Sequence, residues 1–288
     1  MNAGNSGPAD TRGPADRGTP AAAGTAASAG QPGALIRAVW AEPVATITLD
    51  SPANANALSS RLVGELRAAL DDALADPAIR VIVLTGAGRV FCSGADLKES
   101  LSTPRAAAGV MAGVIKLLWE SPKPVVCRVN GSTRAGGIGL VAACDIAIAP
   151  TSATFAFSEV RIGVAPAVIS VPCLRRMPSR AAAEYFLTGE VFDAVRAAEI
   201  GLLTRAVAAT DLDAETDRYT TLLLRAAPGA LAAAKSILRE VATESVADGL
   251  ARMAELSGTL FAGPEAREGM TAFAEKRDPA WVPREQEG

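Results

Sequence analysis

Two largely apolar runs, each followed by a glycine-rich loop, restrict the fold of this 288-residue chain more than any other feature. Residues 81–84 (V-I-V-L) precede the loop 85–97, and residues 125–129 (V-V-C-R-V) precede the loop 130–140. Such uninterrupted runs are typical of strands that are covered on both faces. Helical patterns surround them, and leucine occupies every fourth position from Leu62 to Leu74. The alternation predicts an α/β core.

The other elements follow from the same patterns. Strands are predicted at 36–40, 44–49, 145–149, 154–157 and 202–207, and helices at 59–75, 104–119, 136–143, 168–176, 180–187, 194–200, 213–226, 228–241, 246–261 and 264–276. Helices dominate after Pro166. We therefore expect a core at 34–225 and a C-terminal helical segment at 226–288. Residues 1–33 contain one large apolar side chain, Met1, and are predicted to be a disordered extension.

Composition excludes several classes of function. The chain contains no histidine, which excludes Ser-His-Asp and Cys-His catalysis in their usual form and makes a zinc site improbable. Proton transfer must then fall to other groups such as carboxylates. A net charge of −3 gives no support for nucleic-acid binding, and no apolar run approaches the ~20 residues of a membrane span. The four cysteines lack C-x-x-C spacing and are predicted to be buried thiols in a cytoplasmic protein.

The two glycine-rich loops carry the predicted chemistry. The first ends in S-G-A-D-L (93–97), and the second contains R-A-G-G-I-G-L (134–140), which opens a predicted helix. Glycines let a ligand approach backbone amides, and amides at a helix start carry the positive end of its dipole. Two such loops can direct two N–H groups at one oxygen, which is the arrangement of an oxyanion hole.

These residues resemble the crotonase family, the enoyl-CoA hydratase/isomerase group, from about residue 47 to the C-terminus. The motifs in order are I-T-L-D-S-P-A-N-A-N-A-L-S, V-I-V-L-T-G-A-G-R-V-F-C-S-G-A-D-L-K-E, P-K-P-V-V-C-R-V-N-G, A-G-G-I-G-L-V-A-A-C-D-I-A-I-A and F-A-F-S-E-V-R-I-G-V-A-P. The resemblance implies a spiral of ββα units with a C-terminal helical oligomerisation segment, in a homotrimer or hexamer. It implies an acyl-CoA thioester as substrate, with no other cofactor, and a thioester oxygen held by the amides of Ala95 and Gly136. Glu159 matches a catalytic carboxylate of the family.

The resemblance also implies residues that bind the substrate. They are Asn54, Asn56, Ala57, Asp96 and Leu97 on the coenzyme A side, Gly137 and Gly139 beside the oxyanion hole, and Lys276 for a nucleotide phosphate. Lys276 is equally well explained as a solvated lysine. From the residues themselves, Asp96 is predicted to satisfy loop amides and Glu99 to face solvent. Arg134 is a candidate for binding a distal carboxylate of the substrate, and the alternative is an arginine that points to solvent or pairs with a neighbouring subunit.

One family position departs from the pattern. Two-carboxylate hydratases of this family carry a glutamate three residues after the oxyanion-hole glycine, where this chain has Gly139. A single carboxylate suffices to move a double bond, which favours a Δ3,Δ2-enoyl-CoA isomerase. The neighbouring motifs are most similar to bacterial 3-methylglutaconyl-CoA hydratases, which favours an enoyl-CoA hydratase that accepts branched or acidic chains. A CoA-thioester-binding or scaffold protein without catalysis is the third alternative.

Overall fold

The computed structural model describes residues 1, 33–101, 104–241 and 244–283. The extension predicted at 1–33 lies outside these residues, apart from Met1 and Gly33. The larger sheet has the order β1 (Ile36–Ala41), β2 (Val44–Leu49), β3 (Val81–Gly86), β5 (Val125–Arg128), β7 (Ile146–Pro150) and β10 (Arg205–Val207). The smaller sheet has the order β4 (Val90–Cys92), β6 (Ser132–Arg134), β8 (Thr154–Ala156) and β9 (Phe192–Asp193). Strands are parallel except for the pairs β1–β2 and β8–β9.

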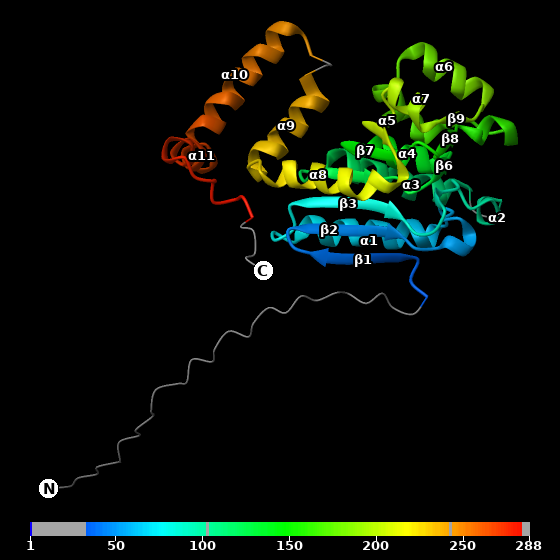
Figure 1. Ribbon diagram of the computed structural model, residues 1–288, viewed down its shortest axis with the longest axis horizontal. Helices are drawn as coiled ribbons and strands as arrows, with labels where there is room; N and C mark the ends of the chain where they lie inside the picture. Colours follow the sequence, from blue (N-terminus) through cyan, green and yellow to red (C-terminus); the bar gives the residue numbers. More distant parts are fainter. Residues whose placement is uncertain (2–32, 102–103, 242–243, 284–288) are drawn as a thin grey trace.

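The helices cover both faces of the larger sheet (Figure 1). They are α1 (Ser60–Ala75), α2 (Leu97–Ser100), α3 (Pro104–Glu120), α4 (Gly136–Ala143), α5 (Ala167–Arg176), α6 (Ser179–Thr188), α7 (Ala194–Glu199), α8 (Leu212–Leu224), α9 (Pro228–Glu240), α10 (Val246–Ala262) and α11 (Pro264–Glu275). Short 3₁₀ helices lie at Pro52–Asn54, Ser158–Ile162 and Ala209–Asp211. The predicted helices are confirmed to within about two residues at each end.

The apolar run of β3 divides between two cores. Ile82 and Leu84 join the main core, on the side of α1 and α3, whereas Val81 and Val83 pack with Leu212 of α8. Because side chains alternate along a strand, both faces of β3 are buried. This confirms the prediction that the strand is covered on both sides.

A strand–strand–helix unit repeats along the chain and positions the loops. In the units β3–β4–α3, β5–β6–α4 and β7–β8–α5, the first strand enters the larger sheet and the second enters the smaller sheet. The α/β fold with ββα units is therefore as predicted. The strands β4 and β6 were assigned to loops, and that assignment was wrong. Three-residue strands are too short to show an alternating pattern, and their pairing depends on strands distant in sequence.

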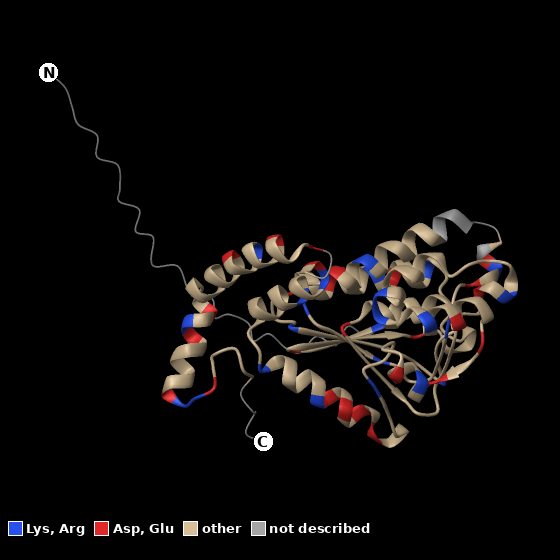
Figure 2. Cartoon of the chain, turned by 90° about the horizontal axis from the view of Figure 1, so that it is seen from above, with Lys and Arg blue, Asp and Glu red and all other residues tan. Residues whose placement is uncertain are grey.

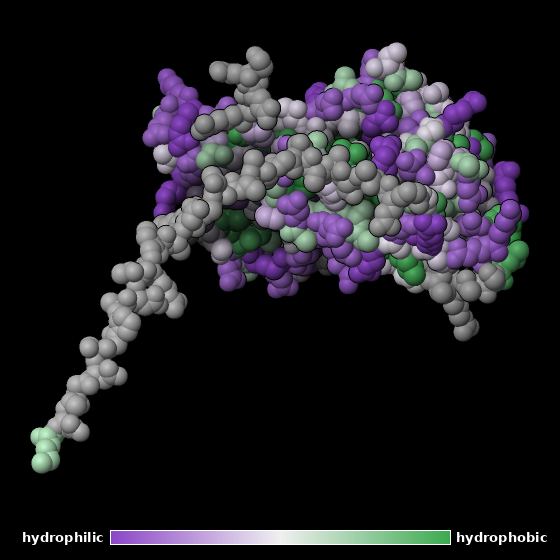
Figure 3. Space-filling view, turned by 90° about the horizontal axis from the view of Figure 1, so that it is seen from below, coloured by the Kyte–Doolittle hydropathy of each residue, from purple (hydrophilic) through white to green (hydrophobic). Residues whose placement is uncertain are grey.

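Residues 228–283 form what we call the C-terminal arm, which contains α9, α10 and α11. The arm extends from one end of the molecule, and α2 lies at the opposite end (Figure 1). Charges of both signs are interspersed over the helices (Figure 2). One face of the molecule carries separate hydrophobic patches among hydrophilic side chains (Figure 3). Among the described residues no single helix is long and apolar enough to cross a membrane; one bent pair, 209–224 with 228–240, passes that test by length and composition.

Candidate active site

The two glycine-rich loops meet at Gly94 and Ala135. An ideal Cβ built on Gly94 would lie 2.8 Å from the Cβ of Ala135, which is closer than real Cβ atoms approach one another. Gly94 also has a φ of +93°, a backbone conformation that glycine adopts without strain. Because the contact joins the residues just before Ala95 and Gly136, it brings the two predicted amides to one place.

The backbone around Ala135 directs the second amide. Ala135 has φ 47° and ψ −122°, which an alanine adopts only under strain, and its N–H donates to the Ala156 carbonyl at 3.1 Å. Gly136 is the first residue of α4, where N–H groups have no partner within the helix. Within the described residues, neither the Ala95 amide nor the Gly136 amide donates a hydrogen bond. Ala95 is exposed, so its N–H is open to a ligand.

A second segment holds the first loop in place. The Leu58 N–H donates to the Gly94 carbonyl at 2.8 Å, which places the predicted stretch 54–57 beside 95–97. The Asn56 side chain is fully buried: its Oδ1 accepts from the Ser51 amide, and its Nδ2 donates to the carbonyls of Ala87, Val90 and Phe91. The side-chain amide of Asn56 is therefore engaged in hydrogen bonds to the backbone of the loop that it supports. Contact with substrate from this stretch stays a prediction.

Asp96 and Glu99 both stabilise helix starts. The Asp96 carboxylate caps α2 by accepting from the Lys98 and Glu99 amides, and it also accepts from Asn54 at 3.1 Å. The bond from the Glu99 amide is the main reason that the pKa of Asp96 lies below its ordinary value. The structural role predicted for Asp96 is confirmed. The prediction that Glu99 faces solvent was wrong, because its Oε2 accepts from the Ser60 amide at 2.8 Å, at the positive end of α1.

Glu159 lies in the 3₁₀ helix that follows β8. In the parallel pairing of β6 with β8, Arg134 lies opposite Ala156. Gly136 follows Arg134 by two residues and Glu159 follows Ala156 by three, so both lie a short way beyond the same paired position. The Glu159 Oε2 atom is buried and has no hydrogen-bond partner in the described part of the chain. Burial raises the pKa of Glu159 above its ordinary value. An unpartnered carboxylate oxygen of this kind can exchange a proton with a bound molecule.

The position of the missing glutamate is filled by side chains from other elements. An ideal Cβ on Gly139 would lie 2.4 Å from Cγ2 of Ile169 and 3.2 Å from Cδ1 of Ile115. Gly137 is equally crowded, by Cys92 and Thr133. Gly139 therefore lies against an aliphatic wall made by α3 and α5. The sequence shows that the glutamate is absent, but no pattern in the sequence indicates that two isoleucines fill its place.

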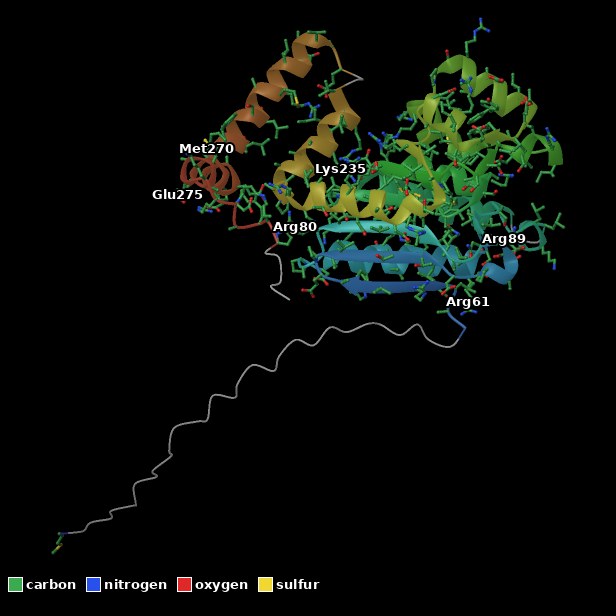
Figure 4. All side chains as sticks on the ribbon, viewed as in Figure 1. Arg61, Arg80, Arg89, Lys235, Met270 and Glu275 are labelled. Atoms are coloured by element: carbon green, nitrogen blue, oxygen red, sulfur yellow. The ribbon has the colours of Figure 1, made fainter. Side chains whose placement is uncertain are left out.

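Two predicted binding residues lie apart from this place. Arg134 donates to the carbonyl of Thr133 at 3.0 Å and to the carbonyl and hydroxyl of Thr154 at 2.6 and 2.9 Å. Strand alternation places it on the face of the smaller sheet opposite Thr133, which packs against Gly137 of α4. Lys276 follows Glu275, which lies on the arm at the far end of the molecule from Arg89 of the first loop (Figure 4).

The cavities of the fold lie elsewhere. A hollow of about 80 Å³ is lined by residues of α3, α5 and α9, among them Trp119, Arg176 and Lys235, and another of about 180 Å³ adjoins it at Asp145. In these places Arg176 donates to the last carbonyls of α4, and Lys235 pairs with Asp145, so the charges there have structural partners.

Comparison with known proteins agrees with this architecture. The family model described as "Enoyl-CoA hydratase/isomerase" matches residues 40–284. Carnitinyl-CoA dehydratase of Proteus mirabilis is 35% identical over 255 residues, covering 84% of this chain and 95% of the relative. The enoyl-CoA hydratase structure of Mycobacterium smegmatis is 31% identical with a TM-score of 0.82, covering 86% of this chain and 98% of the other. A solved structure from Mycobacterium avium paratuberculosis K-10 is 46% identical with a TM-score of 0.67, covering 87% and 100%.

Fold, loops and comparisons together define an acyl-CoA enzyme of the crotonase type. The chain belongs to the enoyl-CoA hydratase/isomerase family.

Proposed function

We propose that this protein is an enoyl-CoA hydratase that uses one carboxylate, Glu159. The observation that carries the proposal is the buried, unpartnered Oε2 of Glu159, on the segment that follows β8, which pairs with the strand leading to Gly136. The names of the dehydratase and hydratase relatives support the same reaction type. Burial supports the role as well, because a carboxyl group with a raised pKa is a stronger base than an ordinary carboxylate when it takes the proton from water.

In the proposed reaction the amides of Ala95 and Gly136 donate to the thioester oxygen. Glu159 takes a proton from water as the oxygen of that water bonds to Cβ, and the Cα–Cβ double-bond electrons move into the thioester enolate. The two amides stabilise the enolate oxygen, and loss of one such donor elsewhere costs about 3–4 kcal/mol. Protonated Glu159 then returns the proton to Cα, so that one water has been added in total. Asn54 and residues 95–97 would line the substrate, whereas Asn56, Gly137 and Gly139, predicted with them, are packed against the protein itself.

A second candidate function is Δ3,Δ2-enoyl-CoA isomerisation by the same glutamate. The observation that favours it is the aliphatic wall at Gly139, where Ile169 and Ile115 leave no room for a second carboxylate that would hold the attacking water. An isomerase needs a single group that removes a proton from one carbon and delivers it to another. Retention of thioester binding without either reaction would identify the third alternative, a binding or scaffold protein.

We further propose that the substrate site is completed in a homotrimer or hexamer. Phe273 and Leu238 of the arm are 87% and 81% exposed, which is unusual for large apolar side chains on one segment and is typical of an interface. The arm lies at the opposite end of the molecule from α2 (Figure 1). Lys276 would then contact the nucleotide of a thioester held by a neighbouring copy rather than by its own chain.

The test follows the ultraviolet absorbance of a conjugated enoyl thioester, with mass analysis of the product. We expect wild type to convert crotonyl-CoA or 3-methylglutaconyl-CoA to a product heavier by one water, and Glu159→Gln to lose this activity. Glu184→Gln, which removes an exposed carboxylate that pairs with Arg196 at 3.8 Å, is the control and should keep it. Conversion of a Δ3 to a Δ2 thioester without water addition would instead identify the isomerase.

A further inference from the structure

Arg80 connects the core of the protein to the C-terminal arm. It precedes β3 and donates through Nη2 to the Leu224 carbonyl at 2.9 Å and the Ala226 carbonyl at 2.8 Å. Its Nη1 donates to the carbonyl of Trp281, near the end of the described chain. One guanidinium therefore contacts the residues just before the arm and Trp281 near the arm's C-terminal end (Figure 4). A planar group with several donors in fixed directions suits three carbonyls better than a flexible ammonium would.

The Arg80 contacts lie at the bend between α8 and α9. The axes of 209–224 and 228–240 differ by 106°, and Leu224 and Ala226 lie at or just after the end of α8. Carbonyls at a helix C-terminus have no partner within the helix, so an outside donor can decide which way the chain continues. Within the described residues the Nε of Arg80 is buried without a partner, so the guanidinium has given up water to make these bonds.

The far end of the arm is fastened to the same place. Trp281 Nε1 donates to the Arg225 carbonyl at 3.1 Å, and its ring lies 3.1 Å from an ideal Cβ on Gly269 of α11. Glu265 of α11 accepts from the Gly229 and Ala230 amides at 2.9 and 3.1 Å, at the start of α9. The C-terminal end of the arm therefore packs against the residues where the arm begins, and Arg80 connects this place to the core.

We propose that Arg80 is a positioning residue that fixes the direction of the C-terminal arm and thereby places Lys276 for a neighbouring copy of the chain. The proposal rests on the proposed function in one respect, that Lys276 of one copy contacts the nucleotide of a thioester bound by another. Arg80 touches neither substrate nor the reacting atoms. Its effect on binding should therefore depend on the nucleotide part of the ligand and not on the acyl part.

The test compares binding of two unreactive thioesters, butyryl-CoA and butyryl-pantetheine, which lacks the nucleotide. For Arg80→Ala we expect the calorimetric Kd of butyryl-CoA to rise about tenfold, as the loss of charged hydrogen bonds would give, and that of butyryl-pantetheine to stay unchanged. Amide hydrogen exchange should rise in α9–α11 and not in α1. Arg225→Ala is the matched control at the same bend, because within the described residues that exposed side chain forms one ion pair, with Asp278 at 3.8 Å, and such an exposed pair contributes little; it should leave all three readouts unchanged.

A milder variant keeps the proposal testable if Arg80→Ala does not fold. Trp281→Phe keeps an aromatic ring but loses the bond to the Arg225 carbonyl and the part of the indole that packs beside Gly269, while Arg80 keeps its own bonds, so it should shift butyryl-CoA binding in the same direction and by less. A folded Arg80→Ala with unchanged exchange in the arm, or with equal loss of affinity for both thioesters, overturns the proposal. If Arg80→Ala does not fold, the same two results for Trp281→Phe overturn it. Because neither ligand reacts, absence of hydratase turnover would count against the proposed function alone.

Discussion

Ile169 occupies the space that a side chain at position 139 would need. Its Cγ2 lies 2.4 Å, and its Cβ 2.9 Å, from the ideal Cβ of Gly139, and neither atom is the free end of a flexible side chain. The glycine and the isoleucine therefore form one packing unit, in which α4 approaches α5 closely. A larger side chain at position 139 would therefore require Ile169 to move or to be replaced as well.

We predict that Gly139→Ala destabilises the protein by about 1–3 kcal/mol, because overpacking a filled core forces its neighbours to move. Ile169→Ala should also destabilise, through the cavity it leaves. The double variant should lose less stability than the sum of the two, because each change relieves the other. Urea unfolding of the four proteins measures this. Additive losses would show that the two residues do not share this space.

The pH dependence of Glu159 gives a second prediction. Burial raises its pKa in the folded state, so the folded protein binds the proton more tightly than the unfolded chain does. Wild type should therefore lose stability relative to Glu159→Gln as pH rises from the ordinary carboxyl pKa to the raised one, and the difference should be constant at higher pH. Catalysis needs the ionised form, so kcat/KM should rise with pH through a midpoint above the ordinary carboxyl value. Stability curves that stay parallel over this window would contradict burial of the charge.

Long elements could be predicted from the sequence because their patterns are local. The helix at 60–75 has a leucine at every fourth position and Ser59 as its N-cap, and the structure shows that Ser59 accepts from Leu62. What could not be predicted depends on contacts between distant residues. The Glu99 bond to the Ser60 amide and the wall at Gly139 join segments 24 or more residues apart, and no periodicity reports on such contacts.

The candidate site divides in the same way. The loops that carry Ala95 and Gly136 were predicted from their glycines, and the structure brings them together at Gly94. Assignment of roles to these residues still comes from the family and stays a prediction. Lys276 could not be placed from the sequence, because its distance from the loops is set by the 106° bend between α8 and α9.

We predict that Gly94→Ala lowers kcat by about a hundredfold, the effect expected of a small misplacement at a reacting centre. The added Cβ would meet Ala135 at 2.8 Å and would also strain a φ of +93°, so the two loops must separate. Gly64→Ala is the control: its Cβ meets nothing within 4 Å in α1, and it should raise stability by roughly 0.5–1 kcal/mol without affecting kcat. Steady-state kinetics and urea unfolding check both. A Gly94→Ala enzyme of normal kcat would show that the amides need not be aligned.

The last prediction concerns the acyl chain and Arg134. If this arginine bound a distal carboxylate, Arg134→Met would lower kcat/KM for 3-methylglutaconyl-CoA and spare crotonyl-CoA. The structure favours the other outcome, because the guanidinium is held by Thr133 and Thr154 on the sheet face away from α4. We therefore expect the ratio of the two kcat/KM values to stay within about twofold, while the free energy of unfolding falls by about 1–3 kcal/mol as the Thr154 groups lose a charged donor.

Arg175→Met serves as the control for that experiment, since Arg175 is exposed and, in the part of the chain that the structure describes, donates only to the Val171 carbonyl of its own helix. It should change neither stability nor the ratio. A selective loss of activity toward the acidic thioester in Arg134→Met alone would mean that substrate binding draws the guanidinium away from Thr154. The hydrogen bonds to Thr133 and Thr154 make such a movement costly, because their acceptors would lose a charged donor. Arg134 is therefore better suited to joining β6 to β8, and so to holding Ala135 in its strained conformation, than to selecting the acyl chain.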